Sequence, residues 1–94
     1  MHPTPPRLHT DAADIARINA NIHALDDEAT VRLTLADGTT LDGTVTARPT
    51  IETFRAADGH EGHNALLRLD DLEDPARSHL VWVDDIVDIT RLLD

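Results

Sequence analysis

The sequence predicts a mainly β domain, a small barrel of five strongly bent antiparallel strands that follows one N-terminal α-helix. The first observation behind this prediction is a hairpin. Apolar residues alternate with polar ones on both sides of Asp37-Gly38, which is the strongest short-range hairpin signal. The second is that Gly43 and Pro49 interrupt the later of the two runs. Glycine lets a strand bend, and proline cannot donate to a neighbouring strand. A long, kinked second strand favours a small, strongly curved barrel.

The N-terminal helix is predicted from a single apolar stripe. Its residues follow one another at spacings of three, four and three, which is typical of an amphipathic helix of about four turns: Ile15, Ile18, Ile22 and Leu25. Thr10 or Asp11 can cap its start. Residues 1–9 contain three prolines and no apolar core, so we interpret them as a flexible tail, neither helix nor signal peptide. A single domain is then expected over residues 10–94.

The five strands follow the helix in order. The hairpin joins a strand that begins at Val31 to a second one that runs, with its bend, to Phe54. Two glycines and polar neighbours predict a loop at residues 56–64. The other three strands are expected at residues 66–69, 79–83 and 87–92. An acidic connection at 70–78 precedes the fourth strand, and a very tight turn at Asp84-Asp85 follows it.

Composition narrows the class of protein. Ninety-four residues make one domain with one modest core. The chain has no cysteine, which excludes disulfides and thiolate metal sites. Its longest apolar run, residues 80–83, is far shorter than the about 20 residues of a membrane-spanning helix, so we expect no membrane contact and a cytoplasmic location. The formal net charge is −10, and all eight cations are arginine. This acidity argues against duplex DNA as a partner, because such binding neutralises phosphates with cations.

Three segments carry a resemblance to a known fold. They are Leu35-Ala36-Asp37-Gly38, Gly43-Thr44-Val45 and residues 81–89. The first is similar to the opening of the Sm1 motif and the last to the frame of Sm2, so the chain resembles the Sm-like (SH3-type) barrel of the Sm, LSm and Hfq proteins. It is more similar still to a family of short uncharacterised bacterial proteins with an Sm-like fold, in which residues 45–51 are the most recognisable part. The resemblance covers residues 10–92.

The resemblance also implies where RNA would bind, and here the chain departs from the pattern. RNA-binding Sm proteins hold a uridine with an Asp and an Asn after the bent strand and with an Arg-Gly pair between the fourth and fifth strands. In this chain Pro49 and Thr50 stand at the Asp position, and Thr53 lies near the Asn position. Asp84-Asp85 replaces Arg-Gly. Two carboxylates repel an approaching phosphate, so the usual uridine pocket is predicted to be absent.

The arginines near the bend leave two interpretations open. Arg48 and Arg55 bracket the bend, and Arg32 and Arg68 lie on neighbouring strands. They could gather into a local cationic patch, or each could pair with a carboxylate, which the excess of acidic residues favours. The candidate binding residues are therefore Arg48, Thr50, Thr53, Arg55, Asp84 and Asp85.

Metal binding and catalysis find little support. His60 and His63 are three residues apart in an expected loop, whereas the helical metal motif needs histidines four apart. The acidic run at residues 70–74 has no glycine for a calcium loop, so we interpret it as solvated. Ser78 is the only serine, and its neighbour His79 would point to the opposite face of a strand. We therefore predict no metal, no cofactor and no enzymatic activity.

The fourth strand suggests an interaction surface. Trp82 lies between Val81 and Val83, so both faces are apolar, and we interpret Trp82 as a core residue, with ligand stacking as the alternative. Sm-like barrels commonly form rings by pairing the fourth strand of one subunit with the fifth of the next. The resemblance thus implies an oligomer interface at Val81, Val83, Val87 and Ile89.

The predicted function is a non-enzymatic Sm-like interaction module that self-associates or binds another protein through its edge strands. The alternative is a divergent single-stranded RNA-binding Sm-like protein in RNA regulation, which the net charge disfavours.

Overall fold

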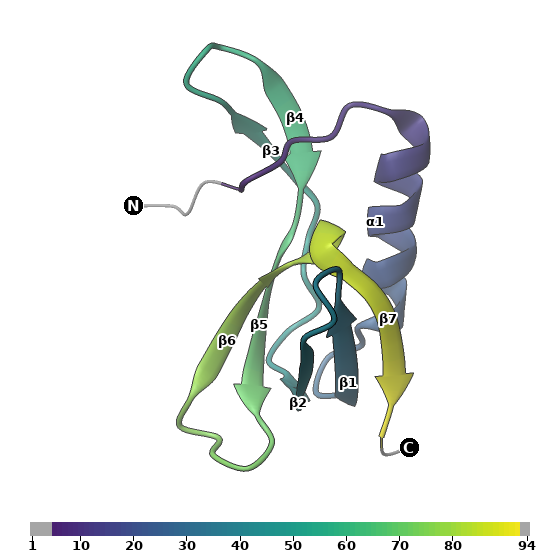
Figure 1. Ribbon diagram of the computed structural model, residues 1–94, viewed down its shortest axis with the longest axis vertical. Coiled ribbons are helices and arrows are strands. Elements are labelled where there is room, and N and C mark those ends of the chain that lie inside the picture. Colours follow the sequence, from purple (N-terminus) through teal and green to yellow (C-terminus); the bar gives the residue numbers. More distant parts are fainter. Residues whose placement is uncertain (1–4, 93–94) are drawn as a thin grey trace.

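The computed structural model describes residues 5–92 as one helix, seven strands and one 3-10 turn (Figure 1). The elements in chain order are α1 (Ala12–Ala24), β1 (Thr30–Leu35), β2 (Thr40–Val45), β3 (Glu52–Arg55), β4 (Glu61–Asn64), β5 (Leu66–Asp71), β6 (Ser78–Trp82), η1 (Val83–Asp85) and β7 (Ile86–Arg91). Residues 1–4, which belong to the predicted tail, and residues 93–94 lie outside the described part.

The strands form two antiparallel sheets, which corrects the prediction of one five-stranded barrel. The main sheet has the order β6-β5-β2-β1-β7, and β3 and β4 form a separate two-stranded ribbon. In Figure 1 this ribbon and the β5–β6 hairpin point toward opposite ends of the molecule. Within residues 5–92, β6 and β7 do not pair with each other, so the sheet is not closed. The mainly β class and the N-terminal helix are confirmed.

The predicted long second strand is divided because the chain leaves the main sheet after Val45. Residues 46–51 are irregular and contain the buried Pro49, which has no N–H to offer a neighbouring strand. The chain becomes extended again as β3, which pairs with β4 in the register Phe54↔Gly62. Part of the loop predicted at residues 56–64 is therefore strand β4.

The hairpin at Asp37-Gly38 is confirmed. Gly38 has a φ of 89°, and the Asp37 carboxylate accepts a hydrogen bond of 2.9 Å from the backbone N–H of Thr39. Gly43 has a different role from the predicted bend. A Cβ atom there would lie 2.4 Å from the Asp70 carbonyl oxygen and 2.7 Å from the Cγ of Leu69. Glycine at this position lets β2 and β5 come together.

The core lies between α1 and one face of the main sheet. The helix contributes two of the four residues of its predicted stripe from within its span and a third from its C-terminal cap: Ile18, Ile22 and Leu25. The strands and η1 contribute most of the remainder, including Val31, Leu33, Val45, Leu67, Leu69, Val81 and Val83. Burial of each large aliphatic side chain stabilises the fold by about 1.5–3 kcal/mol. No helix within residues 5–92 has the length and apolar character needed to cross a membrane.

Residues 5–9, which we call the N-terminal segment, are docked on β4, in contrast to the flexible tail predicted for them. The backbones of His9 and His63 exchange two hydrogen bonds, of 3.0 and 2.8 Å. The buried Asn64 amide donates to the carbonyl oxygen of Arg7 at 3.1 Å. A Cβ atom on Gly62 would lie 2.7 Å from the Cβ of Leu8. Glycine at position 62 therefore leaves room for the segment.

Candidate functional site

The turn η1 joins the two edge strands of the main sheet, and its Asp84-Asp85 pair is held by the N-terminal segment. The Asp84 side chain is 1% exposed. Its Oδ2 accepts a hydrogen bond of 2.8 Å from Nε of Arg7 and lies 2.9 Å from Nε2 of His9. Asp85 is further from Arg7, at 3.6 Å. The docked segment thus places the Arg7 cation beside the acidic pair. This contact was not expected from the sequence, because residues 1–9 were predicted to be a flexible tail.

Two opposing effects set the ionisation of Asp84. Burial by itself raises the pKa of this carboxyl, but the hydrogen bonds with His9 and Arg7, the nearby Asn64 amide and the Arg7 charge outweigh burial and lower the pKa below its usual value. The same hydrogen bond and the charge of Asp84 raise the pKa of Arg7. Asp84 is therefore a carboxylate at neutral pH that ties the N-terminal segment to η1.

A concave site of about 450 Å³ lies beside this cluster, between the N-terminal segment, α1 and the start of β7. Its lining is Arg7, His9, Arg17, Asn21, Ala36, Asp84, Ile86 and Val87. The cationic and anionic groups are already matched, because Arg17 is 3.3 Å from Asp14 and Arg7 is bound to Asp84. The lining contains neither a serine nor a cysteine that could serve as a nucleophile.

The four residues predicted for an oligomer interface lie on β6, η1 and β7, and they differ in how far their side chains are exposed. Val81 and Val83 are buried at 5% and 0% exposure, so their side chains belong to the monomer's core. Val87 is 63% exposed, and Ile89 is partly buried against the core. Sequence reasoning missed Leu80, which is 64% exposed on β6. Because neighbouring residues of a strand point to opposite faces, a buried Val81 would have indicated that Leu80 is exposed.

Trp82 lies outside the buried core in which the sequence placed it. It alternates with Val81, so it stands on the opposite face of β6, where it is only partly buried. Its ring packs edge-to-face on Phe54, with centroids 5.7 Å apart and an interplanar angle of 85°. The chain's only two aromatic side chains therefore contact each other on the outer face.

Comparison with known proteins identifies the family of this chain. The chain belongs to DUF3247, a domain of unknown function, over residues 2–92. It is similar to the crystal structure of XC5848 from Xanthomonas campestris, described as adopting a novel variant of the Sm-like motif. The two are 36% identical with a TM-score of 0.87, over 95% of this chain and 96% of that one. The predicted membership of an uncharacterised bacterial Sm-like family is confirmed. The comparison with curated proteins gave no match.

The arginines that could have formed a free cationic patch are ion-paired in this DUF3247 domain. Arg48 pairs with Asp26 just beyond α1, and Arg55 lies 3.3 Å from a carboxylate oxygen of its cross-strand neighbour Glu61. On the main sheet, Arg32 makes two hydrogen bonds to Asp42, of 2.7 and 2.9 Å, and Arg68 is 3.9 Å from Asp70. Each of the four has a carboxylate partner, which is the second interpretation. Of the other candidates, Thr50 is exposed in the 46–51 connection, and Thr53 contacts His63 and shares β3 with Arg55.

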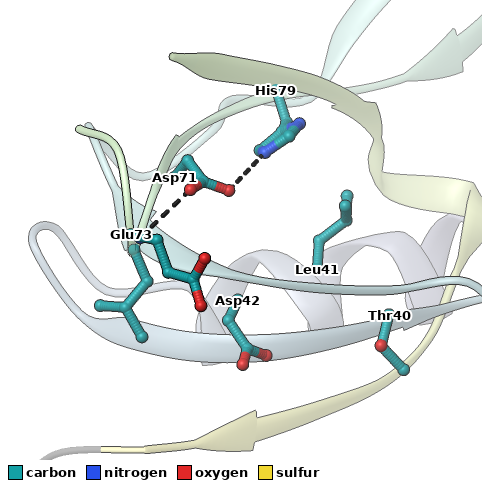
Figure 2. A pocket seen from close by; sticks show the side chains of 7 residues that line it. Thr40, Leu41, Asp42, Asp71, Glu73 and His79 are labelled. Carbon is teal, nitrogen blue, oxygen red and sulfur yellow. Dashed lines mark hydrogen bonds and ion pairs between the residues drawn. The ribbon is translucent and has the colours of Figure 1, made fainter. Parts of the chain in front are cut away.

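A second concave site, of about 210 Å³, lies at the end of the main sheet where β2, β5 and β6 meet. Figure 2 shows Asp71 between His79 and Glu73. Asp71 lies 3.0 Å from Nε2 of His79 and accepts hydrogen bonds from the backbone N–H groups of Glu73 and Asp74. These hydrogen bonds, chiefly that of His79, lower the pKa of Asp71. Asp71 thus shapes the connection to β6.

The histidines considered for metal binding have separate partners. His60 is 2.9 Å from the Asp58 carboxylate in the turn of the ribbon, and Nδ1 of His63 is 3.1 Å from the Thr53 hydroxyl on β3. Across residues 5–92, no three histidine or acidic side chains are arranged to hold a metal ion.

Proposed function

We propose that this DUF3247 chain is a non-enzymatic Sm-like interaction module that associates with further copies of itself through its edge strands. The observation that carries the proposal is β6, an edge strand whose outer side is unpaired within residues 5–92 and which presents Leu80 at 64% exposure. An unpaired edge offers a row of N–H and C=O groups to another strand, and an exposed leucine adds apolar contact.

The side-chain pairing supports binding of protein over catalysis or RNA binding. Polar side chains of both concave sites bind one another, as in the His9–Asp84 and His79–Asp71 pairs, although Oδ1 of Asp84 is buried without a hydrogen-bond partner among residues 5–92. The arginines suggested for RNA contact are ion-paired, so binding phosphate would require them to exchange partners. The net charge of −10 opposes RNA further.

The test is the mass of the protein in solution. Light scattering over a wide range of protein concentrations is expected to show a reversible increase in mass, with and without U-rich or A-rich single-stranded RNA. A monomer at every concentration contradicts the proposal. An RNA complex that weakens with salt, and with Arg48→Ala and Arg55→Ala, supports the RNA-binding alternative in its place.

A further inference from the structure

We infer that the partner of β6 is the β6 strand of a second copy, paired antiparallel about a two-fold axis at Leu80. The inference rests on the proposed self-association and specifies its geometry. It differs from the ring arrangement that joins β6 of one copy to β7 of the next, because only one of the two edges is used and the assembly closes at two subunits.

The backbone of β6 is self-complementary about Leu80. The N–H of Val83 donates to the carbonyl of Ala65, and the N–H of Asp71 donates to the carbonyl of Arg77. The backbone N–H and C=O groups of residues 77 and 83 therefore point toward β5. Because these groups alternate sides along an antiparallel strand, the backbone groups of residues 78, 80 and 82 point away from β5, at the free edge of the sheet. In a two-fold pair, Leu80 lies opposite Leu80 of the second copy, and Ser78 lies opposite Trp82.

The chemistry of β6 fits contact with its own copy. The chain carries 18 acidic residues and eight arginines, yet the strand Ser78–Trp82 has none of them. Pairing two β6 strands therefore brings no like charges together along the contact between them, which we call the seam. On the outer face the apolar side chains of Leu80 and Trp82 stand in line, and both would gain cover from the second copy.

The other edge is less suited to strand addition. Nδ2 of Asn21 donates to the carbonyl oxygens of Ile86 at 3.1 Å and Val83 at 3.3 Å. The β7 strand also carries Asp88 and Arg91, and its register with β1 shifts between Thr34 and Leu35. The β6 edge therefore has the better match in a second β6 than in a β7.

Charge complementarity at the ends of the seam supports the same register. Among residues 5–92, Arg77 is the one arginine outside the ion pairs. The two-fold register places residue 77 opposite Val83 of the second copy, next to the Asp84-Asp85 pair. Each copy would then bring an exposed cation near Asp85 of the other, the carboxylate of the acidic turn that is 35% exposed, twice per dimer. This local attraction offsets part of the repulsion between two acidic chains.

Single cysteines test the register directly, because the chain has none of its own. Leu80→Cys should give a disulfide-linked dimer under mild oxidation, since opposite residues of an antiparallel pair lie about 5.5 Å apart, within disulfide reach. Val87→Cys is the matched control, at 63% against 64% exposure, and should remain mostly uncrosslinked. Crosslinking that needs both variants mixed together indicates β6–β7 pairing and overturns the inference.

A second pair of variants separates this inference from the proposed function. Leu80→Asp sets two carboxylates opposite each other and should weaken association by about tenfold or more, whereas Val87→Asp should leave it unchanged. Circular dichroism confirms that each variant is folded. Equal weakening by both variants, or none by either, overturns the β6–β6 register while self-association stands. A wild-type chain that is always monomeric contradicts both.

Discussion

The two edges of the main sheet differ in how the fold treats them. At β7, Asn21 of α1 occupies backbone carbonyls at the start of the strand, and Arg91 near its end is 3.3 Å from Asp26. At β6, the outer backbone groups have no such cover within residues 5–92, and the strand contains no acidic residue and no arginine. In Figure 1, α1 stands beside β7 and away from the β5–β6 hairpin. The helix contacts one edge and the other is left open, so the proposed self-association is expected at β6.

The largest expected effect on stability comes from the junction between the two edges. Asp84→Ala removes the buried carboxylate that holds Arg7 and His9 and should lower the free energy of unfolding by about 1–3 kcal/mol, measured by chemical denaturation. Asp85→Ala is the control, because the Asp85 side chain is 35% exposed and its contact with Arg7 is longer, at 3.6 Å. It should change stability by less than about 0.5 kcal/mol. Equal effects would show that the N-terminal segment does not depend on Asp84.

Removing the hydrogen bonds that Asn21 makes at the start of β7 should leave this edge open, as the β6 edge is. Asn21→Ala deletes two hydrogen bonds to the carbonyls of Val83 and Ile86 and should cost about 1 kcal/mol. Asn19→Ala, at an exposed position on the same helix, is the matched control and should be neutral. Hydrogen exchange at the start of β7 should accelerate only in the Asn21 variant. Unchanged exchange would mean that α1 does not protect this edge.

The acid side of the stability profile tests the same junction. The pKa values of Asp84 and Asp71 are lowered from the usual 3.8, so the unfolded chain binds more protons near that pH. Their stabilisation is present above the unfolded pKa and is lost as the pH falls through the lower folded values. The melting temperature should therefore decrease below about pH 4. Asp84→Asn should flatten that decrease, and an unaltered slope would contradict the role given to Asp84.

The smallest effect is expected from Arg77 at the ends of the seam. Arg77→Gln should weaken association at low salt by a few-fold, because exposed ion pairs contribute about 0–1 kcal/mol each. High salt should remove the difference from the wild type. Arg68→Gln is the control on the same hairpin, since Arg68 already contacts Ser78 and Asp70. Equal weakening by both variants would indicate a general charge effect.

The sequence was informative where the signal is local. The turn at Asp37-Gly38 and the stripe through Ile18 and Ile22 depend on residues within a few positions of one another. The burial of Asp84 depends on Arg7 and His9, which are 77 and 75 positions away. No pattern in a single sequence shows such a contact.

The misplacement of Trp82 has a different cause. A strand with apolar residues on both faces gives no periodic signal of which face is buried, so the sequence placed Trp82 in the core and assigned Val81 and Val83 to an interface. The ribbon was missed because β4 is formed largely by polar residues, Glu61 to Asn64. The strand is held by backbone pairing with β3 and with His9, and it lacks the apolar alternation from which strands are predicted.

The attachment of the N-terminal segment has a consequence for how this surface can diversify. The segment is held through the backbone of His9 and through the carbonyl of Arg7, with Gly62 leaving room beneath Leu8. Main-chain bonds are indifferent to the side chains that accompany them. Substitutions at positions 7 and 9 leave these main-chain bonds in place, but they change the charge beside η1 and remove partners of the buried Asp84 carboxylate. The segment therefore has two kinds of attachment, main-chain bonds to β4 and side-chain bonds to Asp84, and only the second depends on the residues at positions 7 and 9.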